Sequence, residues 1–286
     1  MFGGLSTVFG KKDLATEGPT TLVIKSKDID IHKFSESNII AMREKYPGYD
    51  DDTLARYLIA RNNDLVKACE QLDRAIAWRI PNYPVLKETC MKEISSGKLY
   101  IRGVCKEGRP LLIFKSCKSF PNERDLEESA RMLVWFAEHL QRTMPPHMSK
   151  YTLLIDRVGH KSENTDMDLV KHCSAQFQDL FPETLSRAII YPSDVVFYTI
   201  WAVVKWFMDP VTREKVQPMM YLSGVEQYID RQYIPKAMGG DDDYEFNPDD
   251  FQDPYTPEEL AKYAADKEKA ATEATATDAT PVEGEK

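Results

Sequence analysis

Short apolar runs alternate with long helical patterns through the middle of the chain, and this alternation limits the possible folds more than any other feature. Each run is bounded by Gly, Pro or charged residues, as buried strands usually are. Helical patterns over about 123–143 and 166–180 separate the later runs. The alternation therefore predicts an α/β fold with a mostly parallel sheet flanked by helices. The expected strands cover 100–105, 111–117, 151–157, 187–192 and part of 215–224, with a closing helix over 225–233.

The first third of the chain shows helical periodicity without such runs. Ser35 is expected to cap a helix that ends at Tyr46, and Asp51 or Asp52 to cap the next one. Two more helices fit 65–79 and 86–96. The expected organisation is a flexible N-terminus (1–34), a helical module (35–97), a sheet domain (98–240) and an acidic tail (241–286) with a helix over 258–269 and disorder after it.

Charge is distributed unevenly along the chain. The formal net charge is −9, but the tail alone holds fifteen acids and four lysines, a balance of −11. The rest is therefore near neutral at +2, which argues against a nucleic-acid-binding protein. The acidic cluster 241–250 does not fit a calcium loop, because Phe246 stands where that loop needs glycine. A solvated segment is the simpler interpretation, and the tail is also a possible site for a protein partner.

The search for catalytic and metal-binding motifs finds none. The five cysteines form no C-x-x-C pair and their number is odd, which favours reduced thiols in a cytoplasmic protein. No histidine pair has zinc-ligand spacing, and no nucleophile or phosphate-loop motif occurs. Asp156 ends an expected strand, where aspartates more often cap the next loop than act in catalysis. We expect a protein that is not an enzyme and that needs no metal or cofactor.

The segment DVVFYTIWAVVKWFMDPVTREKV (194–216) is apolar almost all round. Fourteen residues between Asp194 and Asp209 carry one charge, that of Lys205. As a helix they span about 21 Å, too short for a hydrocarbon core of about 30 Å. On a helical wheel only a narrow stripe departs from apolar character, which is unusual for a surface helix. Periodicity alone leaves two interpretations open: a buried core helix, or a helix that covers an apolar cavity and also meets a membrane.

Four motifs in order resemble the CRAL-TRIO lipid-binding family. FPETLSRAIIYPSDVVFYTIWAVVKWFMDPVTREKV (181–216) is similar to its signature stretch, in which a hydrophobic gating helix ends in Asp-Pro-Val-Thr and a lysine. DDTLARYLIARNNDLVKACEQLDRAIAWR (51–79) resembles the helical module that precedes the domain. EGRPLLIF (107–114) looks like the first strand pair, and YIPKAMGG (233–240) like the usual close. The best-matching branch is that of the secretory phosphatidylinositol-transfer proteins.

The resemblance implies a carrier that encloses one phospholipid in a hydrophobic cavity between the sheet and the gating helix. By motif position, the residues that contact a phosphatidylinositol headgroup are Arg61, Glu183, Thr212 and Lys215. Cations and a hydroxyl suit the phosphate, and an acid accepts hydrogen bonds from inositol hydroxyls. The residues assigned to the gating helix and the cavity lining are Val196, Phe197, Ile200, Trp201, Val204, Phe207 and Met208.

The chain departs from the family pattern at two places. Asn62 stands where the family usually has a lysine, which removes one cation from the phosphate site. After Asp156, His160 and Lys161 occupy a stretch where phosphatidylcholine-binding members place small hydroxyl residues, and Ser162 is the nearest substitute. The expected function is the exchange of phosphatidylinositol and a second hydrophobic ligand between membranes, with transient attachment to their surface. The alternatives are a carrier of a sterol, tocopherol or retinoid-like lipophile, and a lipid-sensing regulatory scaffold.

Overall fold

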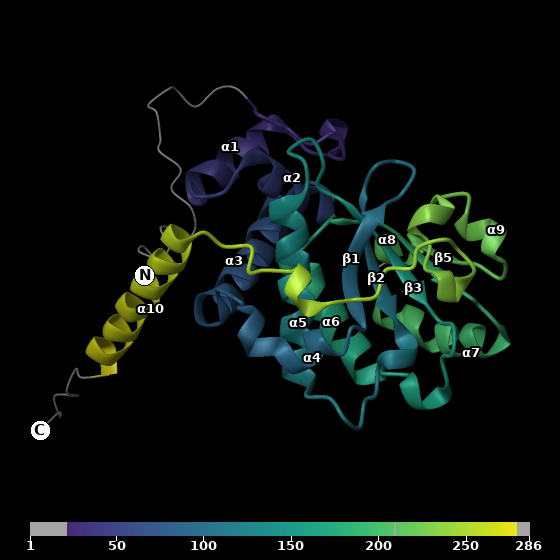
Figure 1. Ribbon diagram of the computed structural model, residues 1–286. Coiled ribbons are helices and arrows are strands. Elements are labelled where there is room, and N and C mark those ends of the chain that lie inside the picture. Colours follow the sequence, from purple (N-terminus) through teal and green to yellow (C-terminus); the bar gives the residue numbers. More distant parts are fainter. Residues whose placement is uncertain (1–21, 209, 279–286) are drawn as a thin grey trace, which may run out of the picture.

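One five-stranded sheet organises the computed structural model, which describes residues 22–208 and 210–278 (Figure 1). The strands follow one another across the sheet in the order in which they occur in the chain. The first pair is antiparallel and the other three pairs are parallel, so the predicted α/β fold is confirmed. The strands are β1 (Leu99–Val104), β2 (Pro110–Lys115), β3 (Tyr151–Asp156), β4 (Leu185–Tyr191) and β5 (Val216–Pro218).

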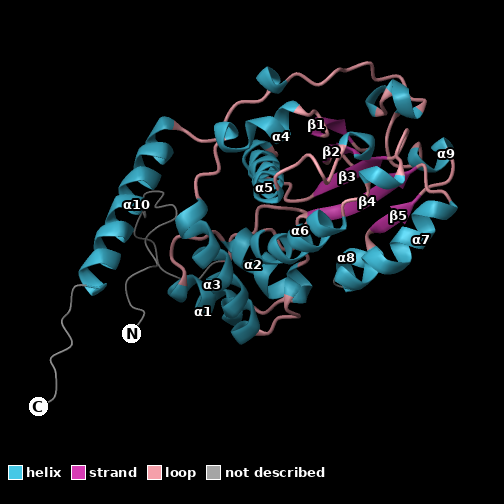
Figure 2. Cartoon of the chain, turned by 90° about the horizontal axis from the view of Figure 1, so that it is seen from below, coloured by secondary structure: helices cyan, strands magenta, loops and turns pink. Residues whose placement is uncertain are grey.

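Helices connect the parallel strands, as the alternation predicts (Figure 2). Asp125 and Asp166 begin the two long ones, because each carboxylate accepts a backbone N–H of the first turn. The connection between β4 and β5 contains the apolar segment, which forms a helix and a 3-10 turn. These elements are α5 (Leu126–Thr143), α6 (Met167–Leu180), α7 (Val195–Val204), the turn Lys205–Phe207 and α8 (Pro210–Glu214).

The N-terminal helices form the predicted module, with one correction at a cap. The amide of Thr53 donates to Asp50, so Asp50 rather than Asp51 or Asp52 caps the second helix. Asp51 and Asp52 are buried in its first turn. The module contains α1 (Glu36–Lys45), α2 (Asp51–Ala60), α3 (Leu65–Asn82) and α4 (Met91–Ser95), and α3 packs against α6. Further 3-10 turns are Ile31–Lys33, Lys87–Cys90, Ser116–Lys118, Ser162–Asn164, Arg231–Tyr233, Lys236–Met238 and Pro248–Asp250.

The segment 22–34 is an ordered part of the fold, so the expectation of a flexible N-terminus is wrong for these residues. Asp51 and Asp52 accept the backbone amides of residues 23, 25 and 26. Asp28 is bound on the other side, where Arg109 and two backbone amides before β3 donate to it. Hydrogen bonds of these three carboxylates therefore hold the segment in place, although its sequence pattern predicts little structure. Residues 1–21 lie outside the described part of the chain.

Asp28 gives this anchoring a testable pH dependence. Burial opposes its charge, but the amide of Ser149 and the guanidinium of Arg109 outweigh that effect and lower the pKa of Asp28 below 3.8. A carboxylate whose pKa is lower in the native state than in the unfolded chain stabilises the fold at pH values above its unfolded-state pKa. This stabilisation is lost as the pH falls through the native-state pKa. We expect Asp28→Asn to lower the free energy of unfolding by about 1–3 kcal/mol at pH 7. Urea denaturation should show this difference shrinking below about pH 4; a difference that stays constant would contradict it.

The chain after the sheet differs from prediction in two ways. The expected closing helix over 225–233 is replaced by the short α9 (Leu222–Val225) and turns. The acidic cluster 241–250 leaves all its acids but Asp242 exposed, as expected of a solvated segment, and it belongs to a strap (241–256) that contacts the body. Asp242 pairs with Arg102, and Asp253 accepts from the indole of Trp135. The last helix, α10 (Pro257–Asp278), continues past the predicted end at 269 through Ala-rich sequence and leads away from the body (Figure 1).

A buried ion pair lies in the core between the module and the sheet. The side chains of Lys98 and Glu93 are 2% and 5% exposed, and their charged groups are in direct contact. Ser129 of α5 donates a hydrogen bond of 2.6 Å to the same carboxylate. The ammonium is thus compensated although water is excluded, which is the condition for keeping a lysine inside a protein.

Candidate functional site

The apolar helix α7 lies on the surface with only one side turned inward. Phe197 is buried, and the other inward residues are half-buried: Ile200, Trp201, Val204, Lys205 and Met208. The ring of Phe197 stacks on that of Trp201, with centroids 6.2 Å apart. The helix is therefore neither a core helix nor an ordinary amphipathic surface helix.

The outward side of α7 is also apolar. Val195 and Trp206 are 82% and 73% exposed, and Met220 and Tyr221 extend the apolar surface at the start of α9. Val196 and Phe207 are exposed as well, at 56% and 39%, and their assignment to the cavity lining stays a prediction. An exposed patch of this kind marks an interaction site. None of the described helices combines the length and apolar character that a bilayer crossing requires.

Arg157 holds the beginning of α7 against the sheet. Asp194 caps the helix by accepting the amide of Phe197 at 2.8 Å. The Arg157 guanidinium donates to Pro192 O at 2.8 Å and to Asp194 at 3.3 Å, and it stacks over the Phe197 ring at 5.2 Å. The sequence motifs did not single out Arg157. Its position directly after a strand that ends in Asp156 is the only signal for it.

The polar residues after Asp156 form a local network. Asp156 accepts the amide of Val158 at 2.9 Å and so caps the turn, while burial raises its pKa. His160 lies between the hydroxyls of Ser116 and Thr165, at 3.0 and 3.2 Å. Burial lowers the pKa of His160, which favours a neutral ring held by two hydroxyls. These hydrogen bonds hold the loop after β3 in its folded conformation.

Glu183 occupies a strained turn between α6 and β4. Its φ of +58° lies in the left-handed region, which non-glycine residues seldom adopt outside functional positions. Lys215 Nζ lies 3.2 Å from Glu183 Oε2. The carbonyl of Thr212, in the last turn of α8, accepts the Lys215 amide at 3.1 Å. The structure thus brings together the side chains of Glu183 and Lys215, and Thr212 is joined to Lys215 through the backbone.

Lys150 joins this cluster from a third strand. Its ammonium lies 3.7 Å from the same oxygen, Glu183 Oε2. Burial lowers the pKa of Lys150; the carboxylate of Glu183 opposes this effect, and the charge of Lys215 adds to it. The three residues stand just before β3, β4 and β5, whose amino ends share one edge of the sheet. Because parallel strands begin at the same edge of a sheet, the predicted beginnings of these strands could have pointed to Lys150. The motif comparison did not use this information.

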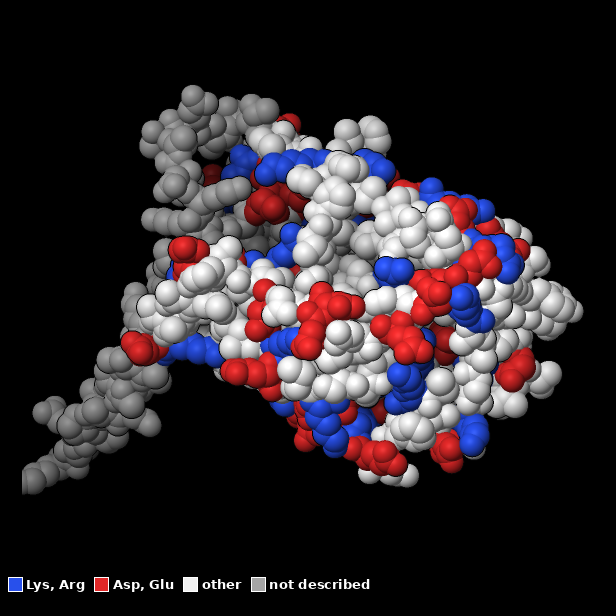
Figure 3. All heavy atoms as spheres, viewed as in Figure 1, with Lys and Arg blue, Asp and Glu red and all other residues white. Residues whose placement is uncertain are grey.

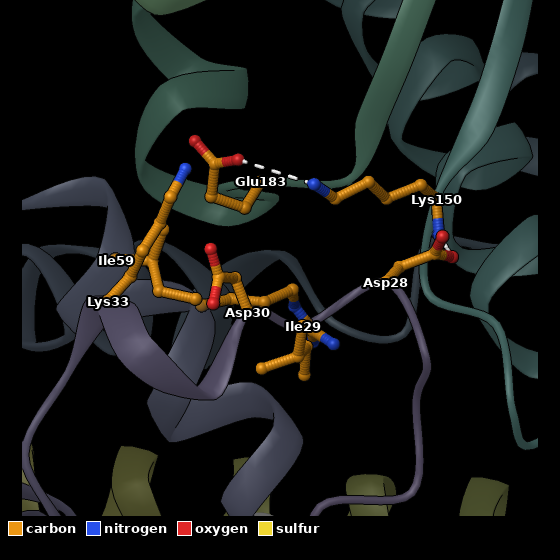
Figure 4. A pocket seen from close by; sticks show the side chains of 8 residues that line it. Asp28, Ile29, Asp30, Lys33, Ile59, Lys150 and Glu183 are labelled. Atoms are coloured by element: carbon orange, nitrogen blue, oxygen red, sulfur yellow. Dashed lines mark hydrogen bonds and ion pairs between the residues drawn. The ribbon is translucent and has the colours of Figure 1, made fainter.

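A small pocket opens next to Glu183 (Figure 4). Lys150 and Lys33 both point toward the Glu183 carboxylate in this view, the first from the turn before β3 and the second from the N-terminal segment. Arg56 of α2 also lines it, and its Nε is buried without an acceptor among the described residues. The full lining is Asp28, Ile29, Asp30, Lys33, Arg56, Ile59, Lys150 and Glu183.

Arg61 is not part of this cluster. It stands at the end of α2, and its Nη2 lies 4.0 Å from Asp179. Asp179 is also bound by Arg74 through two hydrogen bonds of 2.8 Å. No ion pair joins Arg61 to Glu183 within residues 22–208 and 210–278. Asn62 follows with φ of 52°, a conformation that asparagine tolerates better than lysine does.

The face of the molecule seen in Figure 1 carries no large field of one sign. Figure 3 shows acidic and basic side chains interspersed over the face seen in Figure 1. This agrees with the near-neutral charge of the chain without its tail. In the described parts of the chain, no group of three or more His, Cys, Asp or Glu side chains is arranged to hold a metal ion.

Comparison with known proteins gives one family. The family model described as CRAL/TRIO domain matches residues 94–240, just over half of the 286-residue chain. The chain is similar to phosphatidylinositol transfer protein CSR1 of Eremothecium gossypii, with 26% identity over 241 residues that cover 78% of this chain and 55% of that protein. It is also similar to phosphatidylinositol/phosphatidylcholine transfer protein SFH9 of Arabidopsis thaliana, with 27% identity over 68% of this chain and 38% of that protein.

Solved structures show the same fold. The crystal structure of Sfh5 superposes with a TM-score of 0.59 and 15% identity, over 87% of this chain and 89% of that one. This likeness concerns the fold alone. The chain spans about half the length of the two transfer proteins named above.

Proposed function

The chain belongs to the CRAL/TRIO domain family, and from this membership we propose that it binds one phospholipid at a time and carries it between membranes. Phosphatidylinositol is the proposed ligand, exchanged for a second hydrophobic ligand. One observation carries the proposal: Lys215, at the end of a connection whose helix is apolar on both sides, pairs with Glu183 in the turn before β4. The names of two similar proteins, which are transfer proteins of phosphatidylinositol and of phosphatidylinositol and phosphatidylcholine, support it.

The cluster suits the headgroup chemically. Lys215 offers a charged donor to a phosphate, and charge-assisted hydrogen bonds are the strong ones. The Glu183 carboxylate only accepts, which fits the hydroxyls of an inositol ring. Arg61 lies outside the cluster, so its proposed headgroup role requires a movement of α2 or of its own side chain. Glu183 and Lys215 need no such movement, so the proposal rests mainly on these two residues.

The two-sided character of α7 suits a gate. In the closed form the inward side covers the apolar interior and the outward side is exposed to water. At a bilayer the outward side enters apolar surroundings, which stabilises the bound state by roughly 25 cal/mol for each Å² removed from water. Opening then breaks the contacts of Arg157 with Pro192 and Asp194 at the start of the helix. The proposed attachment to membranes is transient, and the proposed location is cytoplasmic.

Mass spectrometry of lipids extracted from the purified protein tests the ligand, and transfer of labelled phosphatidylinositol between vesicles tests the activity. Phosphatidylinositol in the extract together with transfer would support the proposal. A sterol, tocopherol or retinoid-like molecule in the extract, without transfer of phosphatidylinositol, would replace it with the alternative carrier. Absence of any lipid and of transfer would contradict both.

Trp206 tests the membrane role of the outward side. At 73% exposure its ring is available to a bilayer, and the cations of Lys205 and Arg213 lie over it at 5.8 and 5.7 Å. We expect Trp206→Ala to lower binding to vesicles roughly tenfold or more, because a large aromatic contact is lost. Cosedimentation with vesicles measures it. Val66→Ala is the control, since Val66 is 66% exposed on α3; equal losses in both variants would argue against a localised surface.

The role of the tail in binding a protein partner is a further proposal. α10 leads away from the body, and residues 264, 265, 267 and 268 are exposed. Arg142 binds Glu259 at 2.8 Å and anchors the beginning of α10. Truncation after Ala264 therefore removes the outer part while leaving that anchor and the strap 241–256. A truncated protein with unchanged cellular function would contradict a partner at this surface.

A further inference from the structure

Two ammonium groups share one carboxylate oxygen at the amino edge of the sheet. Lys215 and Lys150 lie 3.2 and 3.7 Å from Glu183 Oε2, so their nitrogens are no more than 6.9 Å apart. The side chains of Lys150, Lys215 and Glu183 are 21%, 17% and 15% exposed. Two partly buried positive charges thus face one negative charge. An uncompensated charge in this position is unfavourable unless an anion joins it.

The neighbouring acids do not supply that anion. Asp28 is fully used by Arg109 and by the backbone amides of residues 149 and 150. Asp30 accepts the amide of His32 at 3.0 Å and so caps its own turn. The charge of Asp28 raises the pKa of Lys150, but that of Arg109 lowers it again. Among the described residues, Glu183 is the one carboxylate within ion-pair distance of either lysine.

Arg56 provides an independent indication of a ligand. Its Nε is buried in the wall of the pocket that Lys150 and Glu183 also line, and it finds no acceptor within the described chain. Its Nη2 is bound to Thr53 at 3.0 Å, so the side chain is held in place with one donor unused. A buried donor without an acceptor is rare in proteins and calls for a partner supplied from outside.

We propose that Lys150 is a phosphate-binding residue of the lipid site, acting with Lys215 on the phosphate of the headgroup. A phosphate with charge-assisted bonds of about 2.8 Å can bridge two nitrogens at this separation. Lys150 thereby supplies the second cation that Asn62 removes from the family pattern. The inference rests on the proposed function, because the phosphate is that of the bound phospholipid.

Uptake of labelled phosphatidylinositol from phosphatidylcholine vesicles tests this role. We expect Lys150→Met to lower uptake about tenfold or more, because a hydrogen bond to a charged group is lost. Lys150→Arg should retain most of it, since the charge remains. Lys106→Met is the matched control, because Lys106, in the hairpin between β1 and β2, has its Nζ at the same 3.7 Å from an acid, Asp230, and forms no ion pair with Glu183 among the described residues. The control should behave as the wild-type protein does.

A second measurement separates the sources of phosphate and keeps the inference testable if no lipid is transferred. Amide NMR shifts of residues 150, 183 and 215 are followed while soluble glycerophosphoinositol, or inorganic phosphate alone, is added. Shifts with glycerophosphoinositol that vanish in Lys150→Met support the lipid headgroup as the source. Equal affinity for inorganic phosphate would indicate a site for free phosphate and overturn the headgroup assignment.

The outcomes separate the inference from the proposed function. If the wild-type protein takes up phosphatidylinositol and Lys150→Met takes up as much, the inference is overturned and the proposed function stands. If the wild-type protein takes up none, the proposed function fails, and the NMR measurement alone decides. Absence of any shift in the wild-type protein would then overturn the inference too.

Discussion

Replacing Lys215 with methionine is expected to lower the binding of phosphatidylinositol roughly 10- to 150-fold. The reason is the loss of a charged donor to the headgroup phosphate, worth about 1.5–3 kcal/mol. Methionine keeps the length of the side chain, so the packing around β5 should persist. Extraction of labelled phosphatidylinositol from vesicles, measured over a range of protein concentrations, gives the affinity directly.

Two further variants sharpen this result. Glu183→Gln preserves the shape of a residue in a strained turn but removes the charge that accepts from the inositol ring, and it should also weaken binding. Lys236→Met is the control, since Lys236 binds Asp243 at 3.0 Å in an exposed pair that does not include Glu183 or Lys215. If Lys215→Met and Glu183→Gln bind phosphatidylinositol as the control does, the headgroup site is elsewhere. Unchanged binding of a sterol or another uncharged lipophile would then favour the alternative carrier.

Glu93→Leu is expected to destabilise the fold by about 3–5 kcal/mol. It leaves the ammonium of Lys98, which is 2% exposed, without its carboxylate, and breaking one partner of a buried pair has a cost of this size. Ser129 also loses its acceptor. Urea denaturation of the full chain followed by circular dichroism measures the change in the free energy of unfolding.

The double variant Glu93→Leu/Lys98→Met separates charge from packing. Replacing both partners by apolar residues removes the stranded charge, so much of the lost stability should return. Asp243→Ala serves as the exposed control; its carboxylate is 78% exposed in the pair with Lys236, and we expect a change within about 1 kcal/mol. A double variant as unstable as Glu93→Leu would show that the defect is one of packing.

Local pattern predicted the elements of the sheet domain well. Each predicted strand has a counterpart, because buried strands bounded by Gly, Pro or charge leave a clear signal. The segment 22–34 could not be predicted, because its order comes from carboxylates far along the chain at Asp51 and Asp52. The contacts of the strap could not be predicted for the same reason. Its acidic run predicts a solvated segment, and its contacts with Arg102 and Trp135 arise only in the folded chain.

The candidate site was predicted in part. Glu183 and Lys215, which form an ion pair in the structure, were found through the motif that contains both. Lys150 was missed because no motif includes it and only the alignment of strand starts brings it near. The inward and outward sides of α7 could not be separated from a wheel in which nearly every position is apolar. Val196 and Phe207 were therefore grouped with residues that the structure turns inward, although both are exposed.

The strictly sequential strand order has a consequence for the kinetics of the protein. Open sheets with a reversal in strand order offer a ready crevice at that point, which ligands enter by diffusion. This sheet has no reversal, and right-handed crossovers place the connecting helices on one face. A ligand held between that face and its helices is reached only after a helix moves. On the proposed function, we expect the slow step of entry and exit to be a unimolecular opening, with membranes lowering its barrier rather than increasing encounters.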